Sequence, residues 1–197
     1  TAHCPNTGSM QGLLKKGNTV WVTKSNNPKR KLKFTLQIIK DGNSKVGVNT
    51  HLTNRIVLDA LNNNIIKEFD KEISVKSEVK FGKNTRFDFL ISTKKFKAFL
   101  EVKNVTLKRK PKNAEFPDAI TSRGTKHIKE LLNAKKKGFK IYIIFIVQRE
   151  DCDKFSIAND IDPEYSKTLS IAVKKKLNIL CYDCKFSSKR IEINKKI

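Results

Sequence analysis

The stretch RFDFLISTKKFKAFLEVK, residues 86–103, predicts a β-hairpin, and the rest of the chain is interpreted outward from it. Hydrophobic and polar side chains alternate on both sides of a short polar connection, as they do in two paired strands. Glu101 and Lys103 are two residues apart, so they project from one face of the second strand while Val102 projects from the other. The first strand can bring Asp88 beside them. The hairpin therefore predicts two carboxylates and an ammonium group on one sheet face.

A cluster of this kind is costly unless it binds a cation, because like charges raise one another's pKa and burial penalises each charge. Mg²⁺ is held by a few carboxylate oxygens together with water and phosphate oxygens, and a metal-bound water can attack phosphorus. A nearby ammonium stabilises the negative charge that develops. The pattern therefore favours hydrolysis of phosphodiesters. The alternative is an exposed salt bridge between Glu101 and a neighbouring lysine, worth under about 1 kcal/mol, because the spacing alone is a weak motif.

The charge balance points to a polyanionic partner. Over 197 residues the chain has 42 Lys and Arg against 19 Asp and Glu, a formal net charge of +23. Codon bias towards A·T would enrich Lys, Asn and Ile but would not create so large an excess over acids. DNA is favoured over a membrane, since no basic amphipathic helix with a Trp/Leu face is apparent. Without a long apolar run or a signal peptide, we expect a soluble cytoplasmic protein, with nucleoid association as an option.

The remaining pattern predicts a mixed α/β fold in two parts. Residues 1–46 contain short strands and turns, typical of part of a small barrel. Residues 47–197 alternate helical and strand patterns, and KIYIIFIV at 140–147 is apolar on both faces, as in a central strand covered by helices. Cys181-x-x-Cys184 is interpreted as buried thiols rather than a zinc site, because a second cysteine pair is missing.

Basic and polar residues in three places are candidate contacts to phosphates. They lie in a basic loop at 25–33, in a second basic loop at 108–112 that we expect to be mobile, and along a predicted helix and the end of the central strand. Glu78, on a predicted strand at 73–81, either joins the metal site or pairs with a neighbouring lysine. The candidates for DNA contact are Lys29, Arg30, Lys31, Lys108, Arg109, Lys110, Arg123, Lys126, His127, Gln148 and Arg149.

The hairpin resembles the PD-(D/E)xK nuclease superfamily, with Asp88, Glu101 and Lys103 at the motif positions and Phe87 where the named motif has Pro. Blocks between Thr1 and about residue 165 together resemble the sugar fermentation stimulation protein A family of prokaryotes. These blocks are TAHCPNTGSM, SNNPKRKLKFT, VGVNTHLTNR, EVKNVTL, FPDAITSRGTKHIKEL, FIVQRED and IDPEY.

The resemblance implies an OB-fold domain over residues 1–46, followed by a PD-(D/E)xK nuclease-like domain over 47–197. It also implies non-specific DNA binding and a regulatory link to sugar utilisation, maltose especially. Relative to the family, the chain lacks the opening segment with the first barrel strands, so we expect a truncated barrel.

Two functions stay open on the sequence alone. The first is a Mg²⁺-dependent DNA nuclease, in which Asp88, Glu101, the Val102 carbonyl and Glu78 are the candidate metal ligands and Lys103 stabilises charge. The second is a catalytically inactive DNA-binding regulator of sugar metabolism. The sequence does not set the oligomeric state, and a homodimer is one option.

Overall fold

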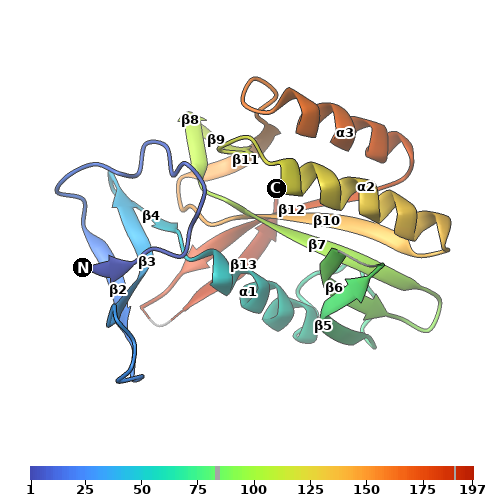
Figure 1. Ribbon diagram of the computed structural model, residues 1–197, viewed down its shortest axis with the longest axis horizontal. Helices are drawn as coiled ribbons and strands as arrows, with labels where there is room; N and C mark the ends of the chain where they lie inside the picture. The colour runs from blue at the N-terminus through green and yellow to red at the C-terminus, as the bar shows by residue number, and fades with distance from the viewer. Residues whose placement is uncertain (83–84, 189) are drawn as a thin grey trace.

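The computed structural model describes residues 1–82, 85–188 and 190–197, which form a small N-terminal sheet beside a larger α/β part (Figure 1). The N-terminal sheet is four-stranded, with β3 in contact with each of the other strands. Its strands are β1 (Ala2–His3), β2 (Val20–Lys24), β3 (Phe34–Asp41) and β4 (Ser44–Gly47).

This sheet is open, since in the described residues β1, β2 and β4 each pair with β3 alone. Its small core consists of Met10, Leu13, Ile39, Val46 and Val48. Every residue of β2 is exposed, and four apolar residues of β2 and β3 remain 39–48 % accessible, namely Val20, Trp21, Val22 and Phe34.

The larger part is organised on a six-stranded mixed sheet with the order β13-β12-β10-β7-β6-β5. The predicted hairpin is present as β6 and β7, which pair from Phe89–Leu100 to Ser92–Lys97. The predicted central strand is β10, which lies parallel to β7 on one side and to β12 on the other. The bounds are β5 (Ser74–Phe81), β6 (Thr85–Ser92), β7 (Lys97–Val105), β10 (Lys140–Val147), β12 (Asn178–Phe186) and β13 (Ile191–Lys196).

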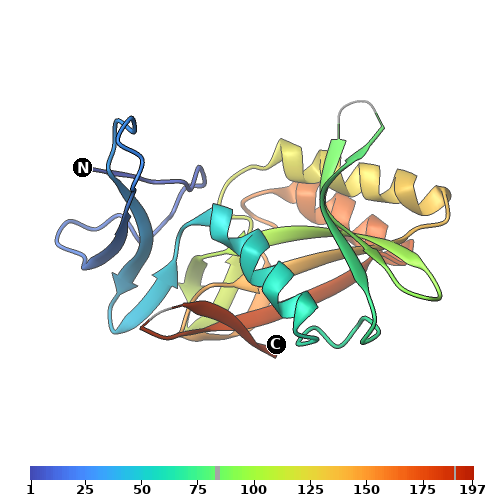
Figure 2. The same ribbon diagram turned by 90° about the horizontal axis from the view of Figure 1, so that it is seen from below.

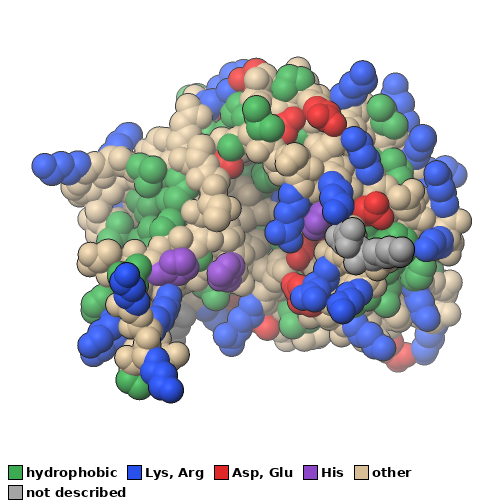
Figure 3. Space-filling view, in the orientation of Figure 1, with side chains coloured by type: hydrophobic (Ala, Val, Ile, Leu, Met, Phe, Trp, Pro, Cys, Tyr) green, Lys and Arg blue, Asp and Glu red, His purple; other side chains and the backbone are tan. Residues whose placement is uncertain are grey.

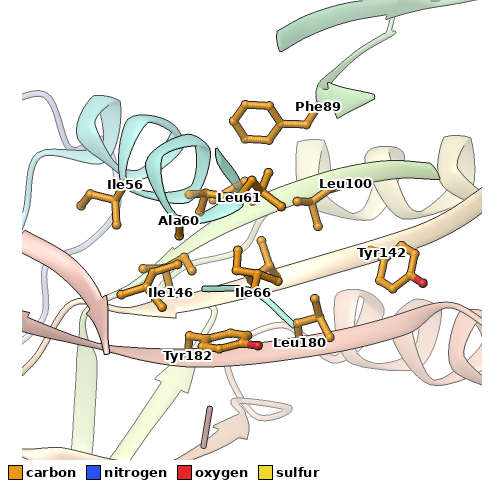
Figure 4. Close-up of a cluster of buried hydrophobic side chains, with 14 of the residues drawn as sticks. Ile56, Ala60, Leu61, Ile66, Phe89, Leu100, Tyr142, Ile146, Leu180 and Tyr182 are labelled. Carbon is orange, nitrogen blue, oxygen red and sulfur yellow. The ribbon is translucent and has the colours of Figure 1, made fainter. Parts of the chain in front are cut away.

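Helices cover both faces of this sheet, which explains why β10 is apolar on both sides. Figure 2 shows α1 (Thr50–Asn62) in front of the sheet, with α2 (Ser122–Lys136) and α3 (Pro163–Lys174) behind it. The apolar face of α1 packs on one core, where Leu61 lies beside Leu100 of β7 (Figure 4). The second core lies under α2 and α3. None of the helices in the described ranges is long and apolar enough to cross a membrane.

A three-stranded sheet corrects the prediction of a mobile basic loop at 108–112. These residues lie in a hairpin of β8 (Leu107–Lys110) and β9 (Lys112–Phe116), and β11 (Cys152–Ile157) extends it by parallel pairing with β9. The strands are held by backbone pairing and by ion pairs of their basic side chains, so this segment is an ordered part of the fold.

Cys181 and Cys184 are free and buried, as predicted. They are three residues apart on β12, so they point to opposite faces of the sheet and lie in different cores. Burial raises the pKa of the Cys181 thiol to about 12. This arrangement is incompatible with a shared zinc ion.

Candidate active site

Asp88 is fixed where β6 and β7 separate. The paired registers of the hairpin end at Phe89–Leu100. Beyond that point the Asp88 side chain bridges the strands, because its Oδ2 accepts the Val102 N–H at 2.7 Å. Its Oδ1 accepts from Asn54 Nδ2 of α1 at 2.8 Å. Burial and the charge of Glu101 raise the pKa of Asp88 to about 6, despite these two donors.

Glu101 is buried and carries the most unusual contacts of the site. Its Oε1 accepts from Lys103 Nζ at 2.7 Å and lies 2.5 Å from His127 Nδ1. Its Oε2 is also buried, yet it has no hydrogen-bond partner among the described residues. Burial by itself would raise the pKa of Glu101, but Lys103 and His127 hold that pKa below its ordinary value. Glu101 is therefore an ionised carboxylate with one oxygen unsatisfied.

The donor set fits a hard divalent cation. A buried carboxylate oxygen without a partner has lost its hydration, and a cation would restore that interaction. The same cation would offset the repulsion by which Glu101 raises the Asp88 pKa. Two carboxylates are enough for Mg²⁺, which keeps several waters and takes further oxygens from a phosphate. Asp88 and Glu101 are the residues that would hold it.

Glu78 does not join these carboxylates. It has φ 55° and interrupts the β5–β6 ladder, in which the residues on either side of it remain paired with β6. Its side chain is 56 % exposed and lies 3.6 Å from Arg86. The described residues contain no group of three His, Cys, Asp or Glu side chains suited to a metal ion. The structure therefore does not support a metal role for Glu78, whose ion partner is Arg86 rather than the expected neighbouring lysine.

His127 and Gln148 are not surface contacts for DNA, contrary to the sequence-based prediction. His127 is buried on α2 and directed at Glu101. Gln148 is 1 % exposed, and its Nε2 donates to Thr53 Oγ1 and Asn104 Oδ1 at 2.9 and 2.6 Å. Gln148 therefore holds the end of β10 against α1 and β7. His127 supports the site by its contact with Glu101.

Arg149 is also a correction. It is buried, and its guanidinium donates to Asp41 at 2.7 Å, to Asp151 at 2.9 and 3.0 Å, and to the Thr106 carbonyl at 2.8 Å. Asp41 belongs to the N-terminal sheet, whereas the other partners belong to the larger part. Arg149 therefore joins the two parts of the molecule and cannot reach a DNA phosphate.

Two of the remaining basic candidates form ion pairs at or near the surface. Lys108 pairs with Asp151, and Arg109 pairs with Asp160 and, at 2.9 Å, with Glu115. Figure 3 shows Lys and Arg side chains on both sides of a recess at the centre of one face. DNA contact stays a prediction for the candidates that reach the surface, which are Lys29, Arg30, Lys31, Lys108, Arg109, Lys110, Arg123 and Lys126.

Asn54, Thr53 and Asn104 support the site but were not identified from the sequence. Asn54 and Thr53 lie on the helix α1, where Asn54 bonds Asp88 of β6 and Thr53 bonds Gln148, which directly follows β10. Thr53 gave one usable signal, since it is a polar residue on the buried face of an amphipathic helix. Such a residue needs a partner, and the partner identifies the contact.

Comparisons with known proteins agree with this architecture. A family model described as "SfsA N-terminal OB domain" matches residues 1–48, and one described as "Sugar fermentation stimulation protein RE domain" matches residues 51–190. The sugar fermentation stimulation protein homolog of Pelagibacter ubique (strain HTCC1062) is 57 % identical over 100 % of this chain and 85 % of its own length. The homolog of Caulobacter vibrioides is 39 % identical over 100 % of this chain and 83 % of its own length.

A solved structure, described as "The structure of Pyrococcus Furiosus SfsA in complex with Ca2+", superposes with a TM-score of 0.90 and 25 % identity. The match covers 100 % of this chain and 84 % of that chain. Two family models together with the close relatives settle the assignment. The chain belongs to the sugar fermentation stimulation protein family.

Proposed function

We propose that this protein binds DNA without sequence preference and that Asp88 and Glu101 hold a divalent cation, Mg²⁺, that supports hydrolysis of phosphodiester bonds. The observation that carries the proposal is the buried, unpartnered Oε2 of the ionised Glu101. Asp88 adds a second carboxylate whose pKa is raised by burial and by the charge of Glu101. The relative from Pyrococcus furiosus was solved with Ca²⁺, another hard cation that takes oxygen ligands.

The chain's own residues prepare this chemistry. Asn54 and the Val102 N–H hold both oxygens of Asp88, so its carboxylate has a fixed orientation. Lys103 is hydrogen-bonded to Glu101, and in the proposed reaction its ammonium would stabilise negative charge on an attacking hydroxide and on the phosphate. His127 keeps Glu101 ionised and directs its Oε1. When bound, Mg²⁺ would supply a water of lowered pKa and neutralise phosphate charge.

The proposed DNA binding rests on the net charge of +23. Lys and Arg contact phosphates without reading the bases, so such binding is sequence-independent and salt-dependent. The β2–β3 loop carries Lys29 and Lys31 at the surface, and α2 carries Arg123 and Lys126 there.

A catalytically inactive DNA-binding regulator of sugar metabolism is the second candidate function. One observation favours it: in the described part of the chain, no third acid, His or Cys completes a metal-binding group with the two carboxylates. The family name also refers to sugar fermentation, and DNA binding through the basic surface would not need the metal.

Plasmid cleavage with and without Mg²⁺ tests the proposal. We expect the wild-type protein to cut, and both Asp88→Asn and Lys103→Gln to lose cutting while keeping their thermal transition. Asp59→Asn is the control, because Asp59 is an exposed acid elsewhere on α1. The catalytic proposal is contradicted if Asp88→Asn and Lys103→Gln still cut the plasmid, or if cutting continues after EDTA has removed the divalent cation. If the wild-type protein binds DNA in a salt-dependent way but does not cut it, the result supports the second candidate function, the catalytically inactive regulator.

A further inference from the structure

The helices α2 and α3 lie side by side (Figure 1). Their carboxyl-terminal ends border a groove of about 670 Å³. The residues that line it are Lys129, Leu132, Asn133, Lys135, Lys136, Lys174, Lys175 and Lys176. No acidic side chain belongs to this lining. We call this set of residues the lysine groove.

The charges of the lysine groove are largely uncompensated. Lys129 lies 3.3 Å from Glu164, near the start of α3. The other five lysine side chains form no hydrogen bond or ion pair with any residue that the structure describes. Lysine in the last turn of a helix does interact favourably with the helix dipole, but this effect fades beyond the last turn. Lys175 and Lys176 follow the end of α3, so the dipole does not account for the full cluster.

Lys176 is the most informative member because its backbone is strained. Its φ is +62°, in the left-handed region where glycine is preferred. The same closing turn ends α2 with Gly138 at φ +90° and ends α1 with Asn64 at φ +53°. In each case the next residue donates its N–H back to the last helical turn, at 2.9, 3.3 and 2.8 Å after Lys176, Gly138 and Asn64 respectively. The chain therefore carries a lysine where glycine would fit better, and that lysine enters the groove.

We propose that the lysine groove binds the phosphate backbone of a DNA duplex and extends the contact surface beyond the candidate active site. Leu132 is the one apolar side chain among the described residues of its lining, so the groove offers little apolar surface for insertion into a membrane. Lysines are point charges without the planar fork of arginine, so they suit phosphate contacts rather than base recognition. This inference rests on the proposed DNA binding but not on cleavage.

The geometry of α2 links the groove to the active site. His127 and Lys136 are nine residues apart, which is roughly 13.5 Å along a helix at 1.5 Å per residue. That length is about four base pairs at 3.4 Å each. Lys126 precedes His127 on α2, and the exposed Lys129 and Asn133 and the half-buried Glu130 lie between His127 and Lys136, so polar side chains continue from one region to the other. A duplex that follows α2 from the candidate active site would reach the lysine groove.

The first test is the salt dependence of binding to a fluorescent 24-base-pair duplex of mixed sequence. The triple variant K136Q/K174Q/K175Q should lower the slope of log K against log [salt] by about 2–3, since each lost phosphate contact removes about 0.9. The control K67Q/K71Q/K195Q removes the same charge in the α1–β5 connection and in β13, and its slope should change by less than about 0.5.

The second test uses Lys176→Gly, a variant that we expect to fold at least as well as the wild type. Glycine relieves the backbone strain, so the melting temperature should stay the same or rise by about 2 °C, while the salt slope falls by about 0.9. Asn64→Gly is the matched control, because it relieves the same strain at α1 without changing charge. A wild-type protein that does not bind the duplex refutes both DNA binding and this inference. Normal wild-type binding with unchanged slopes in both groove variants refutes the lysine groove alone.

Discussion

Arg149→Met should destabilise the protein by about 3 kcal/mol. Its guanidinium, which is 1 % exposed, bonds Asp41, Asp151 and the Thr106 carbonyl. Removing one partner of a buried ion pair costs about 3–5 kcal/mol, because the other charge is left without compensation. The lower end applies because Asp151 keeps Lys108, and the Asp41 and Asp151 side chains are 20 % and 17 % exposed.

Urea unfolding followed by circular dichroism measures this loss. With a slope near 2–3 kcal/mol per molar urea for a protein of this size, the midpoint should fall by about 1 M. Methionine is chosen because it fills much of the same volume without a charge. For the folded variant, the slope of log K against log [salt] for binding to a DNA duplex should equal that of the wild type, since Arg149 is buried between the two parts of the molecule.

Arg123→Met is the matched control. Arg123 is exposed on α2, so its loss should change stability by less than about 0.5 kcal/mol and lower the salt slope by about 0.9. The reasoning is refuted if Arg149→Met unfolds within about 1 kcal/mol of the wild type and lowers the salt slope as Arg123→Met does. That outcome would make Arg149 a phosphate contact, as the sequence alone suggested.

Three further predictions concern Asp151, Gly8 and His127. Burial opposes the charge of Asp151, but Arg149 and Lys108 outweigh it and lower its pKa from 3.8 to about 2. Because the pKa of Asp151 is depressed in the folded state, about 2 kcal/mol of stability is present above pH 5 and is lost as the pH falls towards 2. The urea midpoint of the wild type should therefore fall over this pH range, and that of Arg149→Met should fall less. Gly8→Ala should lower stability by about 1–3 kcal/mol in thermal melts, because a Cβ would lie 2.5 Å from Asp118 Oδ2. Asp118→Ala in that background should cost less than the sum of the single changes, and full additivity would exclude the clash. His127→Leu should weaken Ca²⁺ binding about 10–100-fold in calorimetry, because it removes the group that orients Glu101, and unchanged affinity would exclude that role.

The sequence predicted the elements whose signal is local. The hairpin of β6 and β7 and the apolar strand β10 are encoded by alternation or by continuous hydrophobicity over fewer than about ten residues each. The pair Glu101 and Lys103 followed from strand geometry, and the structure places the two side chains in contact.

Long-range partners explain the errors. Arg149, Gln148 and His127 have the residue types that bind phosphates, but a sequence does not show what lies opposite them. Arg149 bonds Asp41, which is 108 residues away, and Gln148 bonds Thr53, which is 95 residues away. The segment 108–112 was misread for a similar reason, since β9 acquires a parallel neighbour in β11, some forty residues later in the chain.

The position of β10 between β7 and β12 has a consequence for biosynthesis. Seven consecutive buried residues end β10 at Val147, but the strand that covers its second edge, β12, ends only at Phe186. At about 5–20 residues per second, a ribosome needs roughly 2–8 s to make the intervening segment. During that interval the edge of β10 that will pair with β12 has no partner, and such an edge recruits other chains. Chaperone binding is therefore expected to matter most in this window, and the six-stranded sheet is completed only after β13, which ends at Lys196, has been added.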